Sequence, residues 1–357
     1  MRALRSGLLA TAVTLSAATS VVAEDAPAVA ETEAAVAIPV GPLRVTGSST
    51  VTPYALVATG VAAGGAKPSV FVEATGTGAG LAALCGAEAA PLAGASRPIT
   101  QGELTGCAAV GVATVIEAEI GLGAISLVQS EAADPLNLTL DDLYLAAAAR
   151  VPDADCRLVP NKARRWSDVR AGLPDRPIRL YGPTATSGTR DVLQEQALAV
   201  GARRLPCLAA LERQDAAGFA DALRLRRDGA WVDGGESDGA LAYALTRLPE
   251  AVGLVGRVHA LAQDGLTDLP VDGVRAEPSS IADGTYPLAR PLYLYTTADA
   301  LTSDARVRPV LMASTTDEGG ASETLSGMGL VAREGGARVR LISTADGTAT
   351  PLPLGRR

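Results

Sequence analysis

Histidine and aromatic residues are scarce in this chain. It has one His, two Phe and two Trp, and aromatic residues make up 3% of its 357 positions. Because His259 is the only His and no Cys-x-x-Cys pair occurs, the usual ligands of a zinc site are missing. A single His without a Gly-x-Ser-x-Gly turn also gives little support to a hydrolase that uses Ser187 or Ser49 as nucleophile. We therefore expect no enzyme activity, no cofactor and no metal.

The chain also lacks phosphate-loop motifs and an excess of basic over acidic residues. Neither the GxxxxGK[ST] pattern of P-loop proteins nor the GxGxxG pattern of dinucleotide-binding proteins occurs. The formal net charge is −8 and the pI is about 4.9, which argues against nucleic acid and anionic membranes as partners. An anionic ligand would have to be held by local geometry.

After the N-terminus, no stretch offers the roughly 20 consecutive apolar residues that a membrane span requires. The N-terminus itself carries Arg2 and Arg5, then a short apolar run interrupted by Thr and Ser, then small residues up to Ala23. This pattern predicts a cleaved secretory signal peptide over residues 1–23 and a periplasmic protein. Residues 24–41 lack helix caps and apolar periodicity, so we expect a flexible leader there.

Four cysteines remain, at positions 85, 107, 156 and 207. An even number in an exported chain predicts two disulfides. Sequence spacing favours Cys85 with Cys107 and Cys156 with Cys207, although spacing alone leaves the connectivity open.

One local unit recurs along the chain. Runs rich in β-branched residues at 43–46, 70–74 and 178–181 are each followed by a turn of Gly, Ser and Thr and then by a helical pattern. This alternation is typical of α/β folds with a largely parallel sheet. The chain is also longer than one core usually serves, so we expect two lobes.

Two apolar runs, at 121–128 and 286–295, have the composition of strands that cross from one lobe to the other. We therefore predict that residues 42–125 and 290–345 form lobe I and residues 126–289 form lobe II. Residues 346–357 are left as a C-terminal tail.

The turns suggest a kind of ligand. A helix N-terminus offers unpaired backbone N–H groups, and Ser and Thr add hydroxyl donors. A single turn of this composition is most often an ordinary helix cap. Three such turns, together with a Ser-Arg-Pro segment at 96–98, favour a site that surrounds a tetrahedral oxyanion.

The order of these motifs resembles the phosphate-binding proteins of ABC uptake systems, the PstS family. The matching segments are residues 46–53 (TGSSTVTP), 76–80 (GTGAG), 94–99 (GASRPI), 181–189 (YGPTATSGT) and 286–292 (YPLARPL). The Ser-Arg-Pro-Ile version is typical of a subgroup. The resemblance implies a two-lobed, type II-like periplasmic binding protein with mixed sheets, flanking helices and two crossover strands.

The resemblance also implies a function. The protein would bind inorganic phosphate between its lobes, act as a monomer and deliver the anion to the permease subunits of an ABC importer. A sensor or scavenger without a transporter, or less plausibly a phosphatase, is the alternative. The implied ligand-binding residues are Ser49, Thr50, Thr77, Ser96, Arg97, Ser187, Gly188 and Thr189.

Two positions depart from the family pattern. Many members carry an Asp where Arg97 stands and an Arg where Pro183 stands. Arg97 either contacts the anion through its guanidinium fork or forms a salt bridge between loops. The proton of a bound phosphate then needs another acceptor. The candidates are the carboxylates near the motifs, Glu73, Asp191 and Asp238, or a backbone carbonyl.

Other conspicuous residues have ordinary interpretations. We expect His259 to be a plain lobe residue and Trp166 and Trp231 to cover apolar surface. Asp141 and Asp142 suit the first turn of a helix.

Overall fold

The computed structural model describes residues 41–64, 66–86, 90–185, 187–315, 321–333 and 338–353. The predicted signal peptide, the leader up to residue 40, Thr186 and residues 354–357 of the predicted tail lie outside the described residues.

Strands and helices alternate along most of the chain. The strands are β1 (Leu43–Gly47), β2 (Val70–Glu73), β3 (Leu92–Ala95), β4 (Thr114–Ser130), β5 (Arg150–Pro152), β6 (Leu158–Pro160), β7 (Leu180–Gly182), β8 (Trp231–Asp233), β9 (Val252–Gly256), β10 (Leu266–Leu269), β11 (Ala289–Thr297), β12 (Arg338–Ser343) and β13 (Ala349–Pro351). The helices are α1 (Thr52–Ala62), α2 (Thr77–Leu84), α3 (Gln101–Ala109), α4 (Leu140–Ala147), α5 (Trp166–Val169), α6 (Gly188–Val192), η1 (Leu193–Leu198), α7 (Ala199–Arg204), α8 (Pro206–Gln214), α9 (Ala216–Ala222), α10 (Asp238–Leu245), α11 (Arg257–Leu261), α12 (Pro278–Ala282), α13 (Ala298–Ser303), α14 (Val307–Thr315) and α15 (Ala321–Gly327).

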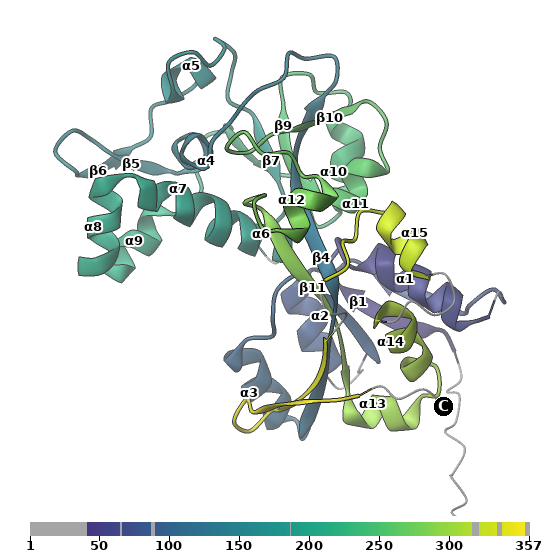
Figure 1. Ribbon diagram of the computed structural model, residues 1–357. Coiled ribbons are helices and arrows are strands. Elements are labelled where there is room, and N and C mark those ends of the chain that lie inside the picture. Colours follow the sequence, from purple (N-terminus) through teal and green to yellow (C-terminus); the bar gives the residue numbers. More distant parts are fainter. Residues whose placement is uncertain are drawn as a thin grey trace, which may run out of the picture. The chain divides into compact units, whose positions relative to one another are not determined.

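The strands form two groups that share β4. In the first group β1 pairs in parallel with β2 and β3, and β11 lies antiparallel between β3 and β4. In the second group β7 pairs in parallel with β8 and β9, and β9 and β10 both pair with the second half of β4. Figure 1 shows the long β4 continuing from the strands around β1 to those around β9, with β11 beside it.

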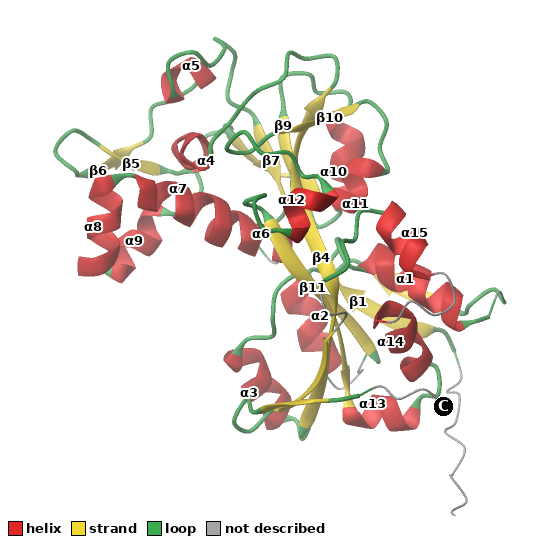
Figure 2. Cartoon of the chain, in the orientation of Figure 1, coloured by secondary structure: helices red, strands yellow, loops and turns green. Residues whose placement is uncertain are grey.

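Helices lie along both strand groups, as Figure 2 shows. In the first group α1 packs against α14 and α2 packs against β3, whereas in the second α10 packs against β9. The predicted α/β fold, with mixed sheets flanked by helices, is confirmed. None of the described helices is long and apolar enough to cross a membrane.

The buried core divides in the same way. The largest apolar cluster takes all its buried members from between Ala124 and Leu288. Another combines residues up to Ile120 with residues from Leu292 onward, and also includes Val258. The side chains that fill each core therefore come largely from one strand group.

The first strand-turn-helix unit needs glycine at one position. Gly47 ends β1 with a φ of 120°, and a Cβ there would lie 2.1 Å from the carbonyl oxygen of Gly94. Only glycine allows both this backbone angle and this close approach. The chain then turns through residues 48–51, with Ser48 N–H donating to Gly94 O, and enters α1, where Pro53 occupies the first turn.

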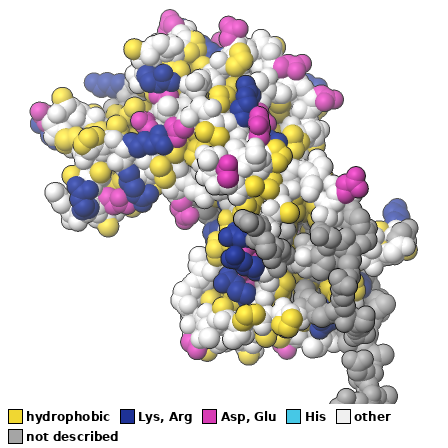
Figure 3. All heavy atoms as spheres, in the orientation of Figure 1, with side chains coloured by type: hydrophobic (Ala, Val, Ile, Leu, Met, Phe, Trp, Pro, Cys, Tyr) yellow, Lys and Arg dark blue, Asp and Glu magenta, His cyan; other side chains and the backbone are white. Residues whose placement is uncertain are grey.

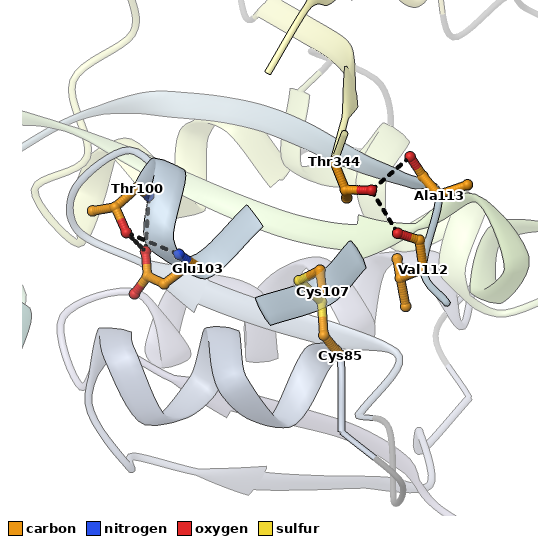
Figure 4. The surroundings of a disulfide bond; sticks show 7 residues. All are labelled: Cys85, Thr100, Glu103, Cys107, Val112, Ala113 and Thr344. Atoms are coloured by element: carbon orange, nitrogen blue, oxygen red, sulfur yellow. Dashed lines mark hydrogen bonds between the residues drawn. A yellow bond between two sulfur atoms is a disulfide. The ribbon is translucent and has the colours of Figure 1, made fainter. Parts of the chain in front are cut away.

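Disulfides join Cys85 to Cys107 and Cys156 to Cys207, the pairing that sequence spacing favours. Cys107 lies in α3, whose N-terminus is closed by a reciprocal capping box between Thr100 and Glu103 (Figure 4). Nearby, Thr344 Oγ1 donates to the carbonyl oxygens of Val112 and Ala113, so the C-terminal segment also holds this region.

Opening the disulfides is expected to destabilise the protein to different extents. In the chain-entropy account a longer loop gives more stabilisation, and the sequence separations are 22 and 51 residues. The Cys85→Ser/Cys107→Ser variant should lose about 3 kcal/mol of unfolding free energy and the Cys156→Ser/Cys207→Ser variant about 4 kcal/mol. Urea titration measures both. Midpoints equal to that of the oxidised wild type would contradict the expectation.

Candidate anion-binding site

The first turn contributes a row of small polar side chains. Ser48, Ser49 and Thr50 follow β1 and are all buried. The residue that precedes α1, Val51, makes no side-chain cap. Among the described residues, the hydroxyls of this turn make no capping hydrogen bond to the start of α1.

The third turn meets the first. Ser187 caps α6, because its Oγ accepts the N–H of Thr189 at 3.2 Å. Thr189 is fully buried, and its Oγ1 lies 3.2 Å from Thr50 Oγ1. The two predicted binding turns, 139 residues apart in sequence, are thus in direct contact.

The second turn lies against the first. Gly76 N–H donates to Gly47 O at 3.0 Å, and a Cβ on Gly80 would lie 2.4 Å from Gly47 Cα. At this turn Thr77 Oγ1 is 3.2 Å from Ser96 Oγ and accepts the Ser96 N–H at 3.3 Å. Thr77 and Ser96 therefore form a buried polar pair.

Arg97 is engaged by a nearby carboxylate. Its two terminal nitrogens donate to the two oxygens of Glu103, each at 2.9 Å, and it also donates to Pro98 O. Burial alone would raise the pKa of Glu103, but hydrogen bonds from Arg97 and Thr100 hold that pKa below its usual value. Arg97 therefore forms a salt bridge to the first turn of α3, which is a local contact and not a bridge between the binding turns.

A buried arginine that sequence analysis missed stands between the first and third turns. Arg290, in β11, is 2% exposed, and its Nη2 donates to Thr50 Oγ1 at 3.2 Å and to Thr189 Oγ1 at 3.3 Å. The available signal was a lone charge inside the apolar run at 286–295. The composition of that run predicts a crossover strand and no contact with a ligand.

One of the three carboxylates considered as acceptors of the phosphate proton lies beside Thr50, Thr189 and Arg290. Asp238, the first residue of α10, is 1% exposed. Its Oδ2 accepts the Gly256 N–H at 2.7 Å and lies 3.5 and 3.4 Å from the hydroxyls of Thr50 and Thr189. Burial raises the pKa of Asp238, while the Gly256 N–H and the nearby His259 and Arg290 oppose that rise.

The other two acceptor candidates have different surroundings. Glu73 is partly exposed and pairs with Arg44 at 3.2 Å. The side chain of Asp191 lies outside the described residues.

His259 has a contact that its sequence context did not suggest. Its Nε2 donates to the backbone carbonyl of Ser49 at 2.8 Å, across 210 residues of sequence. The remaining ordinary interpretations are confirmed: Trp166 and Trp231 are buried, and Asp142 forms a capping box with Thr139 at the start of α4.

The sequence profile of the PBP superfamily domain matches residues 22–310. The chain belongs to the PBP superfamily. Among relatives, protein SphX of Synechococcus elongatus is 27% identical over 65% of this chain and 60% of its own length. The phosphate-binding protein PstS of Staphylococcus haemolyticus is 22% identical over 47% of this chain and 46% of its own. The chain thus spans 60% or less of the length of these two relatives.

A solved structure has a similar fold. It comes from Clostridium perfringens, is assigned as a phosphate ABC transporter substrate-binding protein with bound phosphate, and has a TM-score of 0.57 and 20% sequence identity. The similarity covers 82% of this chain and 99% of that chain.

Gly256 tests how tightly the turns are packed. A Cβ at Gly256 would lie 2.8 Å from Thr50 Oγ1 and 3.2 Å from Asp238 Oδ2. We expect Gly256→Ala to force these groups apart and to cost about 1 to 3 kcal/mol of unfolding free energy. Gly60→Ala is the control, because a Cβ at this α1 position meets nothing within 4 Å. Equal urea midpoints for the two variants would contradict the packing described.

Proposed function

We propose that this chain binds inorganic phosphate between two lobes and delivers it to an ABC importer. The observation that carries the proposal is the meeting of Thr50, Thr189 and Arg290, from three segments distant in sequence. Hydroxyl donors beside a guanidinium suit a small oxyanion, because hydrogen bonds to charged groups are the stronger kind.

The proposed site holds its anion with nearby donors, which is what a chain of negative net charge requires. Its net charge is −8, and Figure 3 shows basic and acidic side chains interspersed on the visible face. An anion would be held by the turns and Arg290, without help from the overall charge. The names of PstS and of the Clostridium perfringens protein support phosphate as the anion.

The proposed ligand-binding set has unequal support. The contact between Thr50 and Thr189 supports those two residues and their neighbours most directly. Arg97 has the weakest support, since Glu103 already engages its guanidinium. The full proposed set is Ser49, Thr50, Thr77, Ser96, Arg97, Ser187, Gly188 and Thr189.

The proposed lobes are residues 42–125 with 290–345, and residues 126–289. The separate apolar cores support this division, because Ala124 and Leu288 bound the larger core. A hinge would then lie where β4 and β11 pass between the two strand groups.

The proposed setting is the periplasm, where the mature chain would act as a monomer and dock on permease subunits. A binding role without catalysis is favoured by the geometry at His259. Its Nε2 is bonded to the carbonyl of Ser49 and not to a hydroxyl, so no serine is paired with a base there.

Calorimetric titration of the mature protein against phosphate, sulfate, molybdate and a phosphonate tests the function. We expect phosphate to bind and to raise the melting temperature as its concentration rises. A melting curve unchanged at millimolar phosphate, with no heat of binding for any of the four anions, would contradict the proposal.

Removing donors should weaken binding in a graded way. Thr189→Val, Thr77→Ala and Ser187→Ala should each cost about 1 to 3 kcal/mol of phosphate binding free energy, because each removes a hydroxyl from the site. Thr302→Val is the matched control, since Thr302 is exposed and, among the described residues, bonds only to the carbonyls of its own helix, α13. If the control weakened binding as much as Thr189→Val, the assignment of the hydroxyls would fail.

A further inference from the structure

The short helix α11 lies at the boundary between the two proposed lobes. It directly follows β9, whose last residue, Gly256, pairs with Ile125 in β4. Position 125 is also where the first segment of lobe I is proposed to end. In sequence α11 belongs to lobe II, so any contact that it makes with lobe I joins segments that are far apart in the chain.

The side chains of α11 contact both lobes. Val258 is 4% exposed and lies in an apolar cluster whose other buried members come from lobe I. Leu261 lies against the turn after α15, because a Cβ on Gly329 would be 2.7 Å from Leu261 Cδ1. Arg257 instead pairs with Asp268 in β10, of lobe II, at 3.2 Å. The helix therefore holds one lobe against the other.

His259 adds a polar contact between α11 and the first binding turn. Its Nε2 lies 2.8 Å from the backbone carbonyl oxygen of Ser49. A carbonyl oxygen can only accept, so the hydrogen of this bond is carried by Nε2. On the other side of the ring, a Cβ on Gly239 would lie 3.2 Å from Nδ1. The imidazole is thus confined between α10 of lobe II and the turn that follows β1.

The carbonyl that His259 contacts belongs to the peptide group between Ser49 and Thr50. A trans peptide group is planar, and its C=O and N–H point in opposite directions. A bond that fixes the carbonyl therefore fixes the direction of the Thr50 N–H, and it also polarises that N–H into a stronger donor. Among the backbone hydrogen bonds of the described residues, none is donated by the Thr50 N–H.

We propose that α11 clasps the two lobes together and that His259 is a positioning residue of the anion site, which orients the peptide group between Ser49 and Thr50. This inference rests on the proposed function. His259 itself does not touch the anion, since its Nε2 is bonded to Ser49 O and its Nδ1 faces α10. It acts through the first turn, by holding that turn against lobe II while the anion is bound.

His259→Leu and His259→Gln separate the donor from the bulk of the side chain. Leu occupies similar space without a donor, whereas the Gln amide can place an N–H near the position of Nε2. We expect His259→Leu to weaken phosphate binding about 10-fold, mainly through faster release, because the bond that holds the turn is lost. His259→Gln should stay within about 3-fold of the wild type. Calorimetry measures the affinity, and loss of bound radiolabelled phosphate measures the release rate.

Thr296→Val is the matched control. Thr296 is fully buried, and its Oγ1 donates to the carbonyl oxygen of Pro91 at 2.7 Å, 205 residues away. Both residues belong to lobe I, so this variant loses a long-range bond to a carbonyl without disturbing α11. Urea titration should show lower stability for Thr296→Val and for His259→Leu. Only His259→Leu should release phosphate faster.

The wild type offers a test that needs no substitution. His259 is the only His, so the imidazole nitrogen signals of a protein prepared without a histidine tag belong to it alone. In the phosphate-saturated protein, nitrogen NMR should show a hydrogen on Nε2 that exchanges slowly with water. A ring without a hydrogen on Nε2 would overturn the inference, and this measurement decides it if neither His259 variant folds.

The outcomes separate the inference from the function beneath it. If the wild type binds phosphate and folded His259→Leu binds and releases it as the wild type does, His259 does not position the site. If His259→Gln is as weak as His259→Leu, or if Thr296→Val weakens binding equally, the donor is not responsible and the inference also fails. If the wild type binds none of the tested anions, the proposed function itself fails.

Discussion

The burial of Arg290 and Asp238 is the constraint on which the rest of the site depends. A charge removed from water must be paired or hydrogen-bonded, because an isolated one costs several kcal/mol. The first turn, the start of α6 and the end of β9 all supply partners to these two residues. The position of each segment is therefore coupled to the others through two side chains.

Much of the fold could be predicted because its signals are local. A strand, its Gly-rich turn and the helix that follows lie within about a dozen residues. The cysteines pair as their spacing favoured, although spacing alone had left the connectivity open. The strand boundaries were less accurate. The run at 286–295 became a strand only from Ala289, because the backbone of Tyr286 bonds in a turn, donating to Ser280 O and accepting the Ala289 N–H.

The site could be predicted only in part, for the same reason. Thr50 and Thr189 belong to recognisable turns. Arg290 lies in the YPLARPL segment, but that segment predicted a strand and not a contact with the binding turns, and His259 has no local motif. The partners of Arg290 and His259 lie 101 to 240 residues away. Such contacts depend on how β4 and β11 join the two strand groups. Arg97 shows that a nearby partner does not make a contact predictable. Glu103 is only six residues on, but the sequence around Arg97 fitted a contact with an anion as well as a salt bridge to the start of α3.

The position of β11 bears on how the chain folds as it is made. β11 lies between β3 and β4, so strands that are close in sequence cannot complete their sheet until residue 297 has been synthesised. β12 then adds to β4 from still nearer the C-terminus, with Arg340 paired to the buried Glu117. Until those segments arrive, β3 and β4 have unpaired edges, which are prone to associate with other chains. The chain must therefore be made as far as β12 before the free edges of β3 and β4 are both covered, whereas β1 is already paired on both sides by β2 and β3.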